Sequence, residues 1–189
     1  MGLTNGPNPV SEMIEDLTGM LNCLAGDPNE VVSLEEEAQY LTYYINIQQK
    51  RFPDRFDFEQ DIAPECLGLS IPHLTLQPLV ENCISHSLVP DRAVHIRLTA
   101  RIEEGIARIT VSDDGCGIPP DKLAALRAQW NDAPSYRHIG LVNTVKRLTL
   151  FYNLSDAVEV VSLPGQGTRV TLRLPVSLLQ SAPFVQPSA

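Results

Sequence analysis

The chain contains few cysteines and no excess of positive charge, and each shortage excludes a class of protein. Its four cysteines, Cys23, Cys66, Cys83 and Cys116, include no C-x-x-C pair, which argues against a zinc site or a disulfide framework and favours reduced thiols. The net charge of -9 argues against nonspecific binding to nucleic acid or to an anionic membrane surface. Local phosphate binding by helix N-termini stays possible, because it needs no net positive charge.

Long apolar runs are also missing from the chain. No stretch approaches ~18 consecutive apolar residues, so we expect no membrane span within it, and no secretory signal is visible. Hydrophobic residues nevertheless make up 43% of the 189 residues and charged residues 20%. This balance predicts one folded α/β domain with a sizeable core and an appendage.

Apolar residues at helical spacing predict three helices in the first half of the chain. The first is expected over about 10–25, and its apolar stripe should pack on a partner surface outside this chain or on a second copy of it. Ser33 and Glu36 form a capping-box pattern that begins the second helix. A third helix is predicted from Pro72, with Pro78 expected to kink it or delay its regular start.

Alternating apolar residues predict the strands, which are expected over 55–62, 94–102, 106–112, 158–160 and 170–174. The second and third of these should form an antiparallel hairpin. Segment 119–138 is polar, with a short helical patch at 122–130, and is typical of a mobile covering loop. From Pro175 onward we expect a frayed tail.

The segment 113–118, of the form D-x-G-x-G-I, directly follows a predicted strand. Because side chains alternate along a strand, Asp113 shares a face with the apolar residues before it. A carboxylate there is partly desolvated and needs a hydrogen-bond donor, while Gly115 and Gly117 allow a sharp turn and close approach to a ligand. These residues alone leave two interpretations open: a plain strand-ending turn, or a site that accepts from the amino group of a flat base.

Further polar or glycine-bearing clusters stand in order along the chain. Asn82 lies four residues before His86, so the two share a helix face, and an asparagine carbonyl oxygen suits a hard metal ion. Gly140 and Leu141 open a predicted helix whose N-terminus could receive phosphate charge. Segment 165–168, of the form G-x-G-T, opens the last strand.

This order of motifs resembles that of the GHKL ATPases, and more closely that of the catalytic domain of LytS-type sensor histidine kinases. The segments that carry the resemblance are 77–86, 113–119, 139–148 and 165–168, together with the helical pieces 33–37 and 47–52. The match covers roughly residues 30–175. It implies an α/β (α+β) two-layer sandwich of the Bergerat ATP-binding type, with a mixed sheet of about five strands backed by about three helices.

The resemblance implies ATP and Mg²⁺ as cofactors and gives roles to individual residues. Asn82 would ligate Mg²⁺, Asp113 would accept from the adenine amino group, and segment 119–138 would cover ATP as a lid. The residues implied for the site are, as catalytic candidates, Glu81 and His86 and, as nucleotide contacts, Asn82, Asp113, Gly115, Gly117, Ile118, His138, Gly140, Leu141 and Thr168. Phosphoryl transfer depends mainly on positioning and charge stabilisation, so few catalytic side chains are expected.

The resemblance also implies a division of the chain. The expected parts are a disordered end at 1–9, a remnant of the dimerisation and phosphoacceptor helices at 10–29, a linker helix at 30–53, the ATP-binding domain at 54–176 and a tail at 177–189. The implied partners are the phosphoacceptor helices of the same kinase and a response regulator, without nucleic acid. The parent protein is expected to be a membrane-anchored homodimer with this domain in the cytoplasm.

The departures from the family pattern lie mainly near the expected phosphates. The first histidine is His73, so we expect a truncated kinase without its own phosphoacceptor. Ser85 stands where the family often has a lysine, and His138 where a glycine is usual. An ATP-binding kinase domain and a degenerate domain that acts as an interaction module therefore both stay open. Pro78 replaces the glutamate with which GHKL hydrolases activate water, so rapid ATP hydrolysis is not expected.

Several other residues keep two interpretations. Glu81 fits a supporting role at the metal and equally an ordinary helix carboxylate. Lys146 and Arg147 fit phosphate contact or a solvated helix face. His73 and His95 are expected to be structural or at the surface.

A protein-serine kinase of the anti-sigma type would fit the same fold, but not the linker helix.

Overall fold

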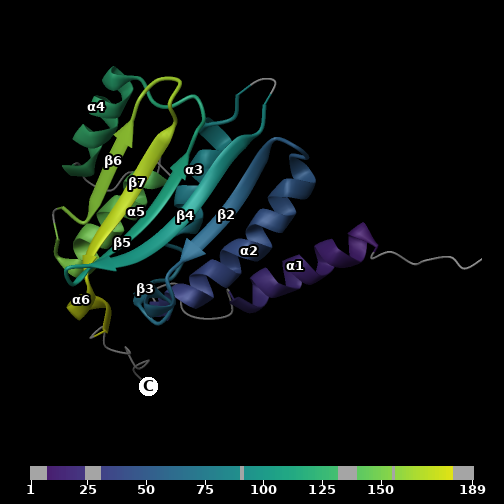
Figure 1. Cartoon of the computed structure of the whole chain (residues 1–189), viewed down its shortest axis with the longest axis horizontal. Helices are drawn as coiled ribbons and strands as arrows, with labels where there is room; N and C mark the ends of the chain where they lie inside the picture. Colours follow the sequence, from purple (N-terminus) through teal and green to yellow (C-terminus); the bar gives the residue numbers. More distant parts are fainter. Residues whose placement is uncertain (1–7, 24–30, 90–91, 132–139, 155, 181–189) are drawn as a thin grey trace, which may run out of the picture.

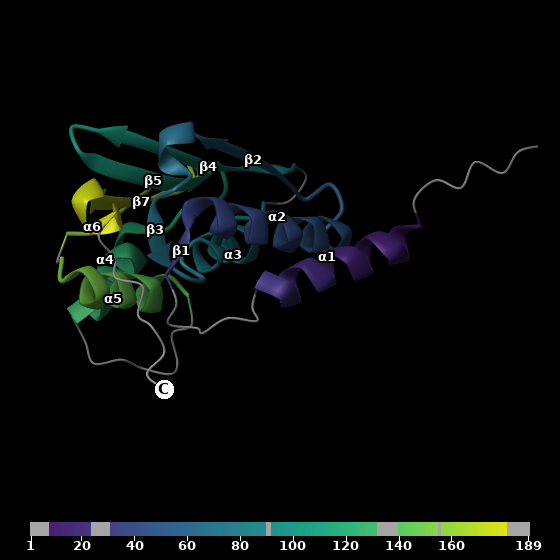
Figure 2. The same ribbon diagram turned by 90° about the horizontal axis from the view of Figure 1, so that it is seen from below.

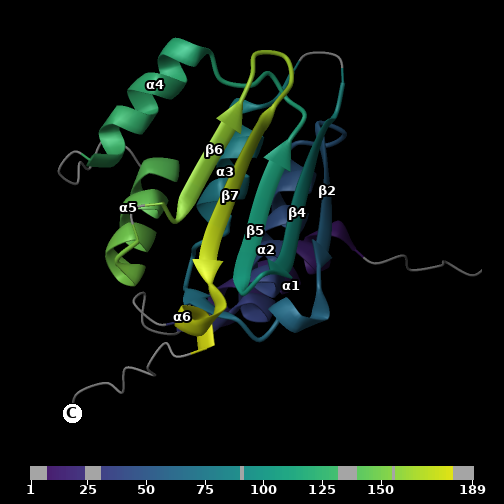
Figure 3. The ribbon, with the colours of Figure 1, turned by 60° about the vertical axis from the view of Figure 1, so that its left-hand side comes forward.

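The computed structural model describes residues 8–23, 31–89, 92–131, 140–154 and 156–180. A five-stranded sheet forms one layer and helices cover one of its faces (Figures 1 and 2). In spatial order its strands are β2 (Phe56–Ile62), β4 (Val94–Glu103), β5 (Ile106–Asp113), β7 (Thr168–Pro175) and β6 (Val158–Ser162) (Figure 3). β2 and β4 run parallel and the other neighbours run antiparallel. The predicted mixed sheet and the β4–β5 hairpin are confirmed.

Three helices back the sheet, as predicted: α2 (Leu34–Arg51), α3 (Gln77–His86) and α5 (Leu141–Tyr152). The others are α1 (Pro9–Cys23), which packs outside α2, α4 (Pro120–Ala128), which lies beyond the β6 edge, and α6 (Val176–Gln180), which follows β7 (Figures 2 and 3). The short elements are β1 (Val31–Ser33), paired antiparallel with β3 (Ser70–Pro72), and two 3-10 turns, η1 (Pro64–Cys66) and η2 (Gln129–Asn131).

Strict alternation along the central strands explains the two layers. Ile96, Leu98, Ile109 and Val111 are buried against the helices, and each such side chain contributes about 1.5–3 kcal/mol through burial. The opposite face is polar, as in antiparallel sheets with one solvated side. There Arg97 forms ion pairs with the β2 carboxylates at 3.3 Å. The helix-facing side therefore holds the core.

Three local predictions have clear outcomes. The capping box at Ser33 and Glu36 is confirmed, and α2 begins directly after it. The prediction of a helix from Pro72 is wrong, because Pro72 belongs to β3 and α3 begins at Gln77. Pro78 lies in the first turn of α3, where its missing N–H costs nothing, so it delays the regular start as predicted.

The C-terminal prediction is partly wrong. Residues 176–180 form α6 instead of a frayed tail, because Leu179 is fully buried and the Val176 N–H donates to the Gly105 carbonyl oxygen at 2.9 Å. Residues 181–189 lie outside the described part of the chain. Within the described ranges, no helix is both long enough and apolar enough to cross a membrane.

α1 contacts the rest of the molecule mainly through polar and small residues. Asp16 is buried and accepts from Asn46 at 2.9 Å and from Lys50 at 3.1 Å, while Gly19 lies against the Tyr43 ring. Its large apolar side chains are mostly exposed: Val10, Met13, Ile14, Leu17 and Leu21. That this stripe needs a partner surface stays a prediction, and residues 24–25 of the predicted helix lie outside the described part.

Candidate functional site

Asp113 ends β5 on the buried face, as its place in the alternating pattern predicts. Its residue is 8% exposed, and its Oδ1 accepts from the Gly115 N–H at 2.9 Å. It lies opposite Thr168 of β7 in the strand register. Burial raises the pKa of the Cys83 thiol well above its usual value, and the charge of Asp113 acts in the same direction. Asp113 therefore faces α3, which carries Cys83.

Two glycine loops meet beside Asp113. Gly167 has φ 81° and Gly117 has φ 67°, in the left-handed region that side chains disfavour. A Cβ at Gly167 would overlap the carbonyl oxygen of Asp113, and one at Gly117 would overlap that of Leu163. The Gly165 N–H donates to the Cys116 carbonyl oxygen at 2.8 Å. The loops after β5 and between β6 and β7 thus hold each other through backbone contacts.

Ser162, a residue that the sequence interpretation missed, links these loops. Its hydroxyl oxygen accepts from the Ile118 N–H at 2.7 Å, and lies 2.9 Å from both the Gly167 carbonyl oxygen and the Thr168 hydroxyl. The signal was present in the sequence, because Ser162 follows Val158 and Val160 at period two, just as Asp113 follows its own apolar residues. We call the following set the sheet-end cluster: Asp113, Gly115, Gly117, Ile118, Ser162, Gly167 and Thr168.

A second group of predicted residues meets where α3 approaches the start of α5. The Asn82 Nδ2 donates to the Pro78 carbonyl oxygen at 2.6 Å, which orients the amide. A Cβ placed on Gly140 would lie 3.3 Å from Asn82 Oδ1 and 3.4 Å from its Nδ2, so the amide group faces the residue that precedes α5. Leu141 is buried behind it. We call Asn82, Gly140 and Leu141 the helix-end cluster.

The end of α3 connects the two clusters. The Cys116 N–H donates to the Ser87 carbonyl oxygen at 3.2 Å, and the Cys116 thiol donates to that of His86 at 3.0 Å. A Cβ at Gly115 would overlap the Ser87 carbonyl oxygen, which explains the glycine there. The glycine loop after β5 is therefore fixed on the same helix that carries Asn82.

The other predicted catalytic side chains, Glu81 and His86, are exposed on α3. Burial, followed by the charge of Glu81, raises the pKa of Tyr44 to about 12. His138 lies outside the described part of the chain. Of the predicted lid, residues 120–131 form α4 and η2, and 132–139 are not described.

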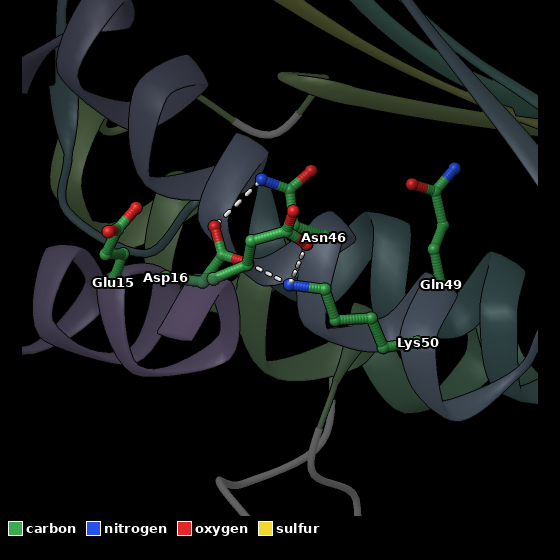
Figure 4. Close-up of a pocket in the computed structure, with 6 residues that line it drawn as sticks. Glu15, Asp16, Asn46, Gln49 and Lys50 are labelled. Carbon is green, nitrogen blue, oxygen red and sulfur yellow. Dashed lines mark hydrogen bonds and ion pairs between the residues drawn. The ribbon is translucent and has the colours of Figure 1, made fainter. Parts of the chain in front are cut away.

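A hollow of about 190 Å³ lies at the sheet end, and its lining includes Asp113, Ser162, Gln166 and Thr168. Asn82 does not line it. A larger hollow of about 460 Å³ lies between α1 and α2, away from both clusters (Figure 4). There Lys50 and Asn46 of α2 point toward Asp16 of α1, so these polar groups already satisfy one another.

The remaining charged candidates have structural partners. Arg147 contacts the carbonyl oxygens of His73 and Leu74, so neither of its predicted interpretations, phosphate contact or a solvated face, describes it. His73 is buried against Glu37, and His95 lies at the surface with its Nε2 3.3 Å from Glu59, so the prediction for both histidines is confirmed. Within the described ranges, no group of three His, Cys, Asp or Glu side chains could hold a metal ion.

Comparisons with known proteins identify the family of the chain. Residues 70–178 match the family described as histidine kinase-, DNA gyrase B-, and HSP90-like ATPase, and residues 1–56 match the histidine kinase family. The chain is 33% identical over 172 residues to the sensor histidine kinase YesM of Bacillus subtilis, covering 90% of this chain and 28% of that protein. It is 32% identical over 160 residues to the sensor protein LytS of Staphylococcus saprophyticus, covering 83% of this chain and 27% of that protein.

Solved structures share the fold. The histidine kinase domain of the Erythrobacter litoralis EL346 blue-light activated kinase superposes with a TM-score of 0.57 at 20% identity, covering 95% of this chain and 80% of that one. The histidine kinase domain of the E. coli osmosensor EnvZ gives 0.52 at 20% identity, with 87% and 95% covered. The resemblance drawn from the motifs is thus confirmed, and the chain belongs to the family of histidine kinase-, DNA gyrase B- and HSP90-like ATPases.

Proposed function

We propose that this chain carries the ATP-binding catalytic domain of a two-component sensor histidine kinase. It would transfer the γ-phosphoryl group of ATP to a histidine on the kinase's dimerisation helices, for relay to a response regulator. The chain spans under a third of the length of the two relatives described above, so the activity of the whole protein belongs to the proposal. The observation that carries it is that Asn82 lies beside Gly140. Asn82 belongs to α3, and the end of this helix also holds the glycine loop that follows Asp113.

The sheet-end cluster would bind adenine. Asp113 is buried, acceptor-only and already oriented by the Gly115 N–H, so its second oxygen can accept from the exocyclic amino group. Gly117 and Ile118 would lie beside the base, and Thr168 would support the pocket through its bond to Ser162. These groups would fix the base and therefore position the triphosphate.

The helix-end cluster would bind the phosphates and Mg²⁺. Mg²⁺ prefers oxygen ligands and keeps several waters and substrate phosphates, so a single protein ligand, Asn82 Oδ1, fits it. When bound, Mg²⁺ would neutralise charge that develops on the transferred phosphoryl group. The backbone at Gly140 and Leu141 opens α5, whose N-terminal N–H groups favour an anion. Glu81 and His86 flank Asn82 and would assist at this end, and His138 would contact phosphate.

The proposed division of the chain follows the same scheme. The parts are 10–29 as the end of the phosphoacceptor helices, 30–53 as the linker helix and 54–176 as the ATP-binding domain, with 1–9 and 177–189 as ends. The parent kinase would be a membrane-anchored homodimer with this domain in the cytoplasm. Its partners would be the acceptor helices and a response regulator, without nucleic acid.

A second candidate is a degenerate domain that acts as an interaction module. Ser85 favours it, because this exposed α3 residue supplies no cation where related kinases often have a lysine. The hollow at the sheet end also favours it, since about 190 Å³ is below the size of most small-molecule sites, roughly 300–1,000 Å³.

Calorimetry with Mg·ATP on the whole chain separates the two candidates. The kinase proposal expects saturable binding that Asn82→Ala weakens strongly when Mg²⁺ is present and little when EDTA removes it. Transfer of labelled phosphate to a separately supplied acceptor-helix fragment of the same kinase tests the reaction itself. A folded chain that shows no binding heat at millimolar Mg·ATP would instead be the interaction module.

A further inference from the structure

The segment 73–76, which leads into α3, is held on one side by a buried carboxylate from α2. Glu37 is 1% exposed, and its Oε1 accepts from the Leu74 N–H at 2.5 Å and lies 3.0 Å from His73 Nδ1. Its Oε2 accepts from the Thr75 and Leu76 N–H groups, both at 2.9 Å. These N–H groups belong to the N-cap of α3, Leu76, and to the two residues before it, so they have no partner within the helix and Glu37 satisfies them.

The same segment is held on its other side by α5. Arg147 donates to the carbonyl oxygens of His73 at 2.8 Å and Leu74 at 2.7 Å, and to the Thr75 hydroxyl at 3.2 Å. A planar guanidinium suits such paired acceptors, which an ammonium group cannot match. We call Glu37, Arg147 and segment 73–76 the three-helix clamp, since it joins α2, α3 and α5.

The clamp holds a backbone conformation that would not persist by itself. Leu74 has φ 57°, which a leucine seldom adopts. A buried carboxylate is also unfavourable unless hydrogen bonds compensate it, and here both oxygens of Glu37 are used. The conformation of segment 73–76 therefore depends on Glu37 and Arg147 acting from opposite sides.

Two of the three helices that the clamp joins, α3 and α5, also form the helix-end cluster. α3 begins directly after segment 73–76 and carries Asn82, and α5 begins directly after Gly140 and carries Arg147. Any tilt of α3 against α5 at the clamp changes how Asn82 faces Gly140. The sheet-end cluster is held mainly by other contacts, namely the strand register and the loops around Gly117 and Gly167, and it meets the end of α3 at Ser87, remote in sequence from the clamp.

We propose that Glu37 and Arg147 are positioning residues that fix α3 against α5, so that Asn82 faces the start of α5 in the geometry needed for Mg·ATP. This inference rests on the proposed function. Since Glu37 belongs to α2, the position of α2 sets the phosphate end of the site and affects the adenine end much less.

Glu37→Gln tests the inference in the whole chain. Glutamine keeps the shape of the side chain, but its NH₂ group would face two donors where an oxygen now accepts. Affinity for Mg·ATP, measured by calorimetry, falls about tenfold or more, as for other groups that orient a metal ligand. Affinity for adenosine, measured by NMR titration at millimolar concentrations, stays within about twofold because the strand register and the loop contacts that hold the sheet-end cluster lie outside the clamp. Glu35→Gln, which removes an exposed charge from the same helix, leaves both affinities unchanged.

Substitutions of Arg147 test the clamp from the α5 side, and they test the inference even if Glu37→Gln does not fold. Arg147→Met removes all three bonds, whereas Arg147→Lys keeps the charge and can reach one carbonyl oxygen. The loss of Mg·ATP affinity is therefore larger for Arg147→Met than for Arg147→Lys, and adenosine affinity is again retained. Tyr152→Phe is the matched control, because its hydroxyl donates from α5 to the Ser70 carbonyl oxygen at 3.3 Å, outside the clamp.

Equal losses for Mg·ATP and adenosine in these variants, or no loss for either, would overturn the inference. If the unaltered chain itself binds no Mg·ATP, the proposed function fails and the clamp is judged by amide hydrogen exchange. Faster exchange in α3 and α5 of Glu37→Gln, with β5 unchanged, supports the clamp. Uniform acceleration, or none, refutes it.

Discussion

In the sheet-end cluster, backbone atoms of two loops hold each other, whereas in the helix-end cluster one side chain faces the start of a helix. Gly117 and Gly167 leave no space for a Cβ, and Ser162 closes the contact through its hydroxyl. The Asn82 amide instead lies beside Gly140, where an added Cβ would be 3.3 Å from its Oδ1, and this approach depends on how two helices are set against each other. The proposed adenine end is thus fixed by local backbone packing, and the proposed phosphate end by tertiary contacts further away.

The largest effect is expected from Gly167→Ala, in the backbone contact of the sheet-end cluster. The new Cβ would overlap the Asp113 carbonyl oxygen at a residue with φ 81°, so unfolding should become easier by about 3 kcal/mol or more. Urea denaturation measures this. Gly165→Ala is the control, since it has φ 73° but open space around it, and should cost about 1–2 kcal/mol. Equal losses in the two variants would mean that the loops do not hold each other.

Asp113→Asn should weaken all adenine ligands without unfolding the chain. The asparagine oxygen can still accept from Gly115, but its NH₂ group would meet the amino group of the base. This donor mismatch should cost about 1–3 kcal/mol of binding for both adenosine and Mg·ATP. Asp114→Asn, one residue further and exposed, should bind both ligands as the unaltered chain does. Unchanged ATP binding in Asp113→Asn would disprove the adenine assignment.

Ser85→Lys should affect only the helix-end cluster. It restores an α3 cation three residues after Asn82, and should raise Mg·ATP affinity about two- to fivefold at low salt, less at high salt. Adenosine affinity should not change. Gln39→Lys, which adds the same charge at an exposed position of α2, is the control and should have little effect on Mg·ATP affinity. A gain that is equal for both ligands would place position 85 near the base instead.

The smallest effect concerns the pH dependence of stability at Asp114, beside the sheet-end cluster. Partial burial raises its pKa, but bonds from the His95 N–H at 2.7 Å and from Arg92 at 2.9 Å outweigh this, so the pKa lies below its usual 3.8. A carboxyl whose pKa is lowered by folding stabilises the protein above its unfolded pKa, and this contribution is lost as the pH falls through the folded pKa. Asp114 is largely exposed, so the contribution should be below about 1 kcal/mol.

Urea denaturation at several pH values, with Asp114→Asn for comparison, measures this contribution. The unaltered chain should be the more stable at neutral pH, and the difference should vanish in strong acid. A difference that grows as the pH falls would show that the sign of the pKa shift is wrong.

Much of the fold and of the sheet-end cluster could be predicted from the sequence, because local rules determine them. Alternation placed Asp113 on the buried face and the capping box marked the start of α2, whereas the start of α3 was predicted too early, at Pro72, although Pro78 indicated a delay. The same alternation pointed to Ser162, although only the structure revealed its bonds. These features follow from backbone geometry over a few neighbouring residues.

Only the tertiary structure decided which residues hold the helix-end cluster. Glu37, His73 and Arg147 lie far apart in the sequence, and no periodicity or spacing brings them together. Arg147 resembled a surface or phosphate-binding cation until its bonds to the carbonyl oxygens before α3 were seen. The sequence by itself therefore determined the family, the strands and the buried carboxylate of Asp113. The setting of α3 against α5 came from buried polar groups, whose partners are chosen by packing in three dimensions.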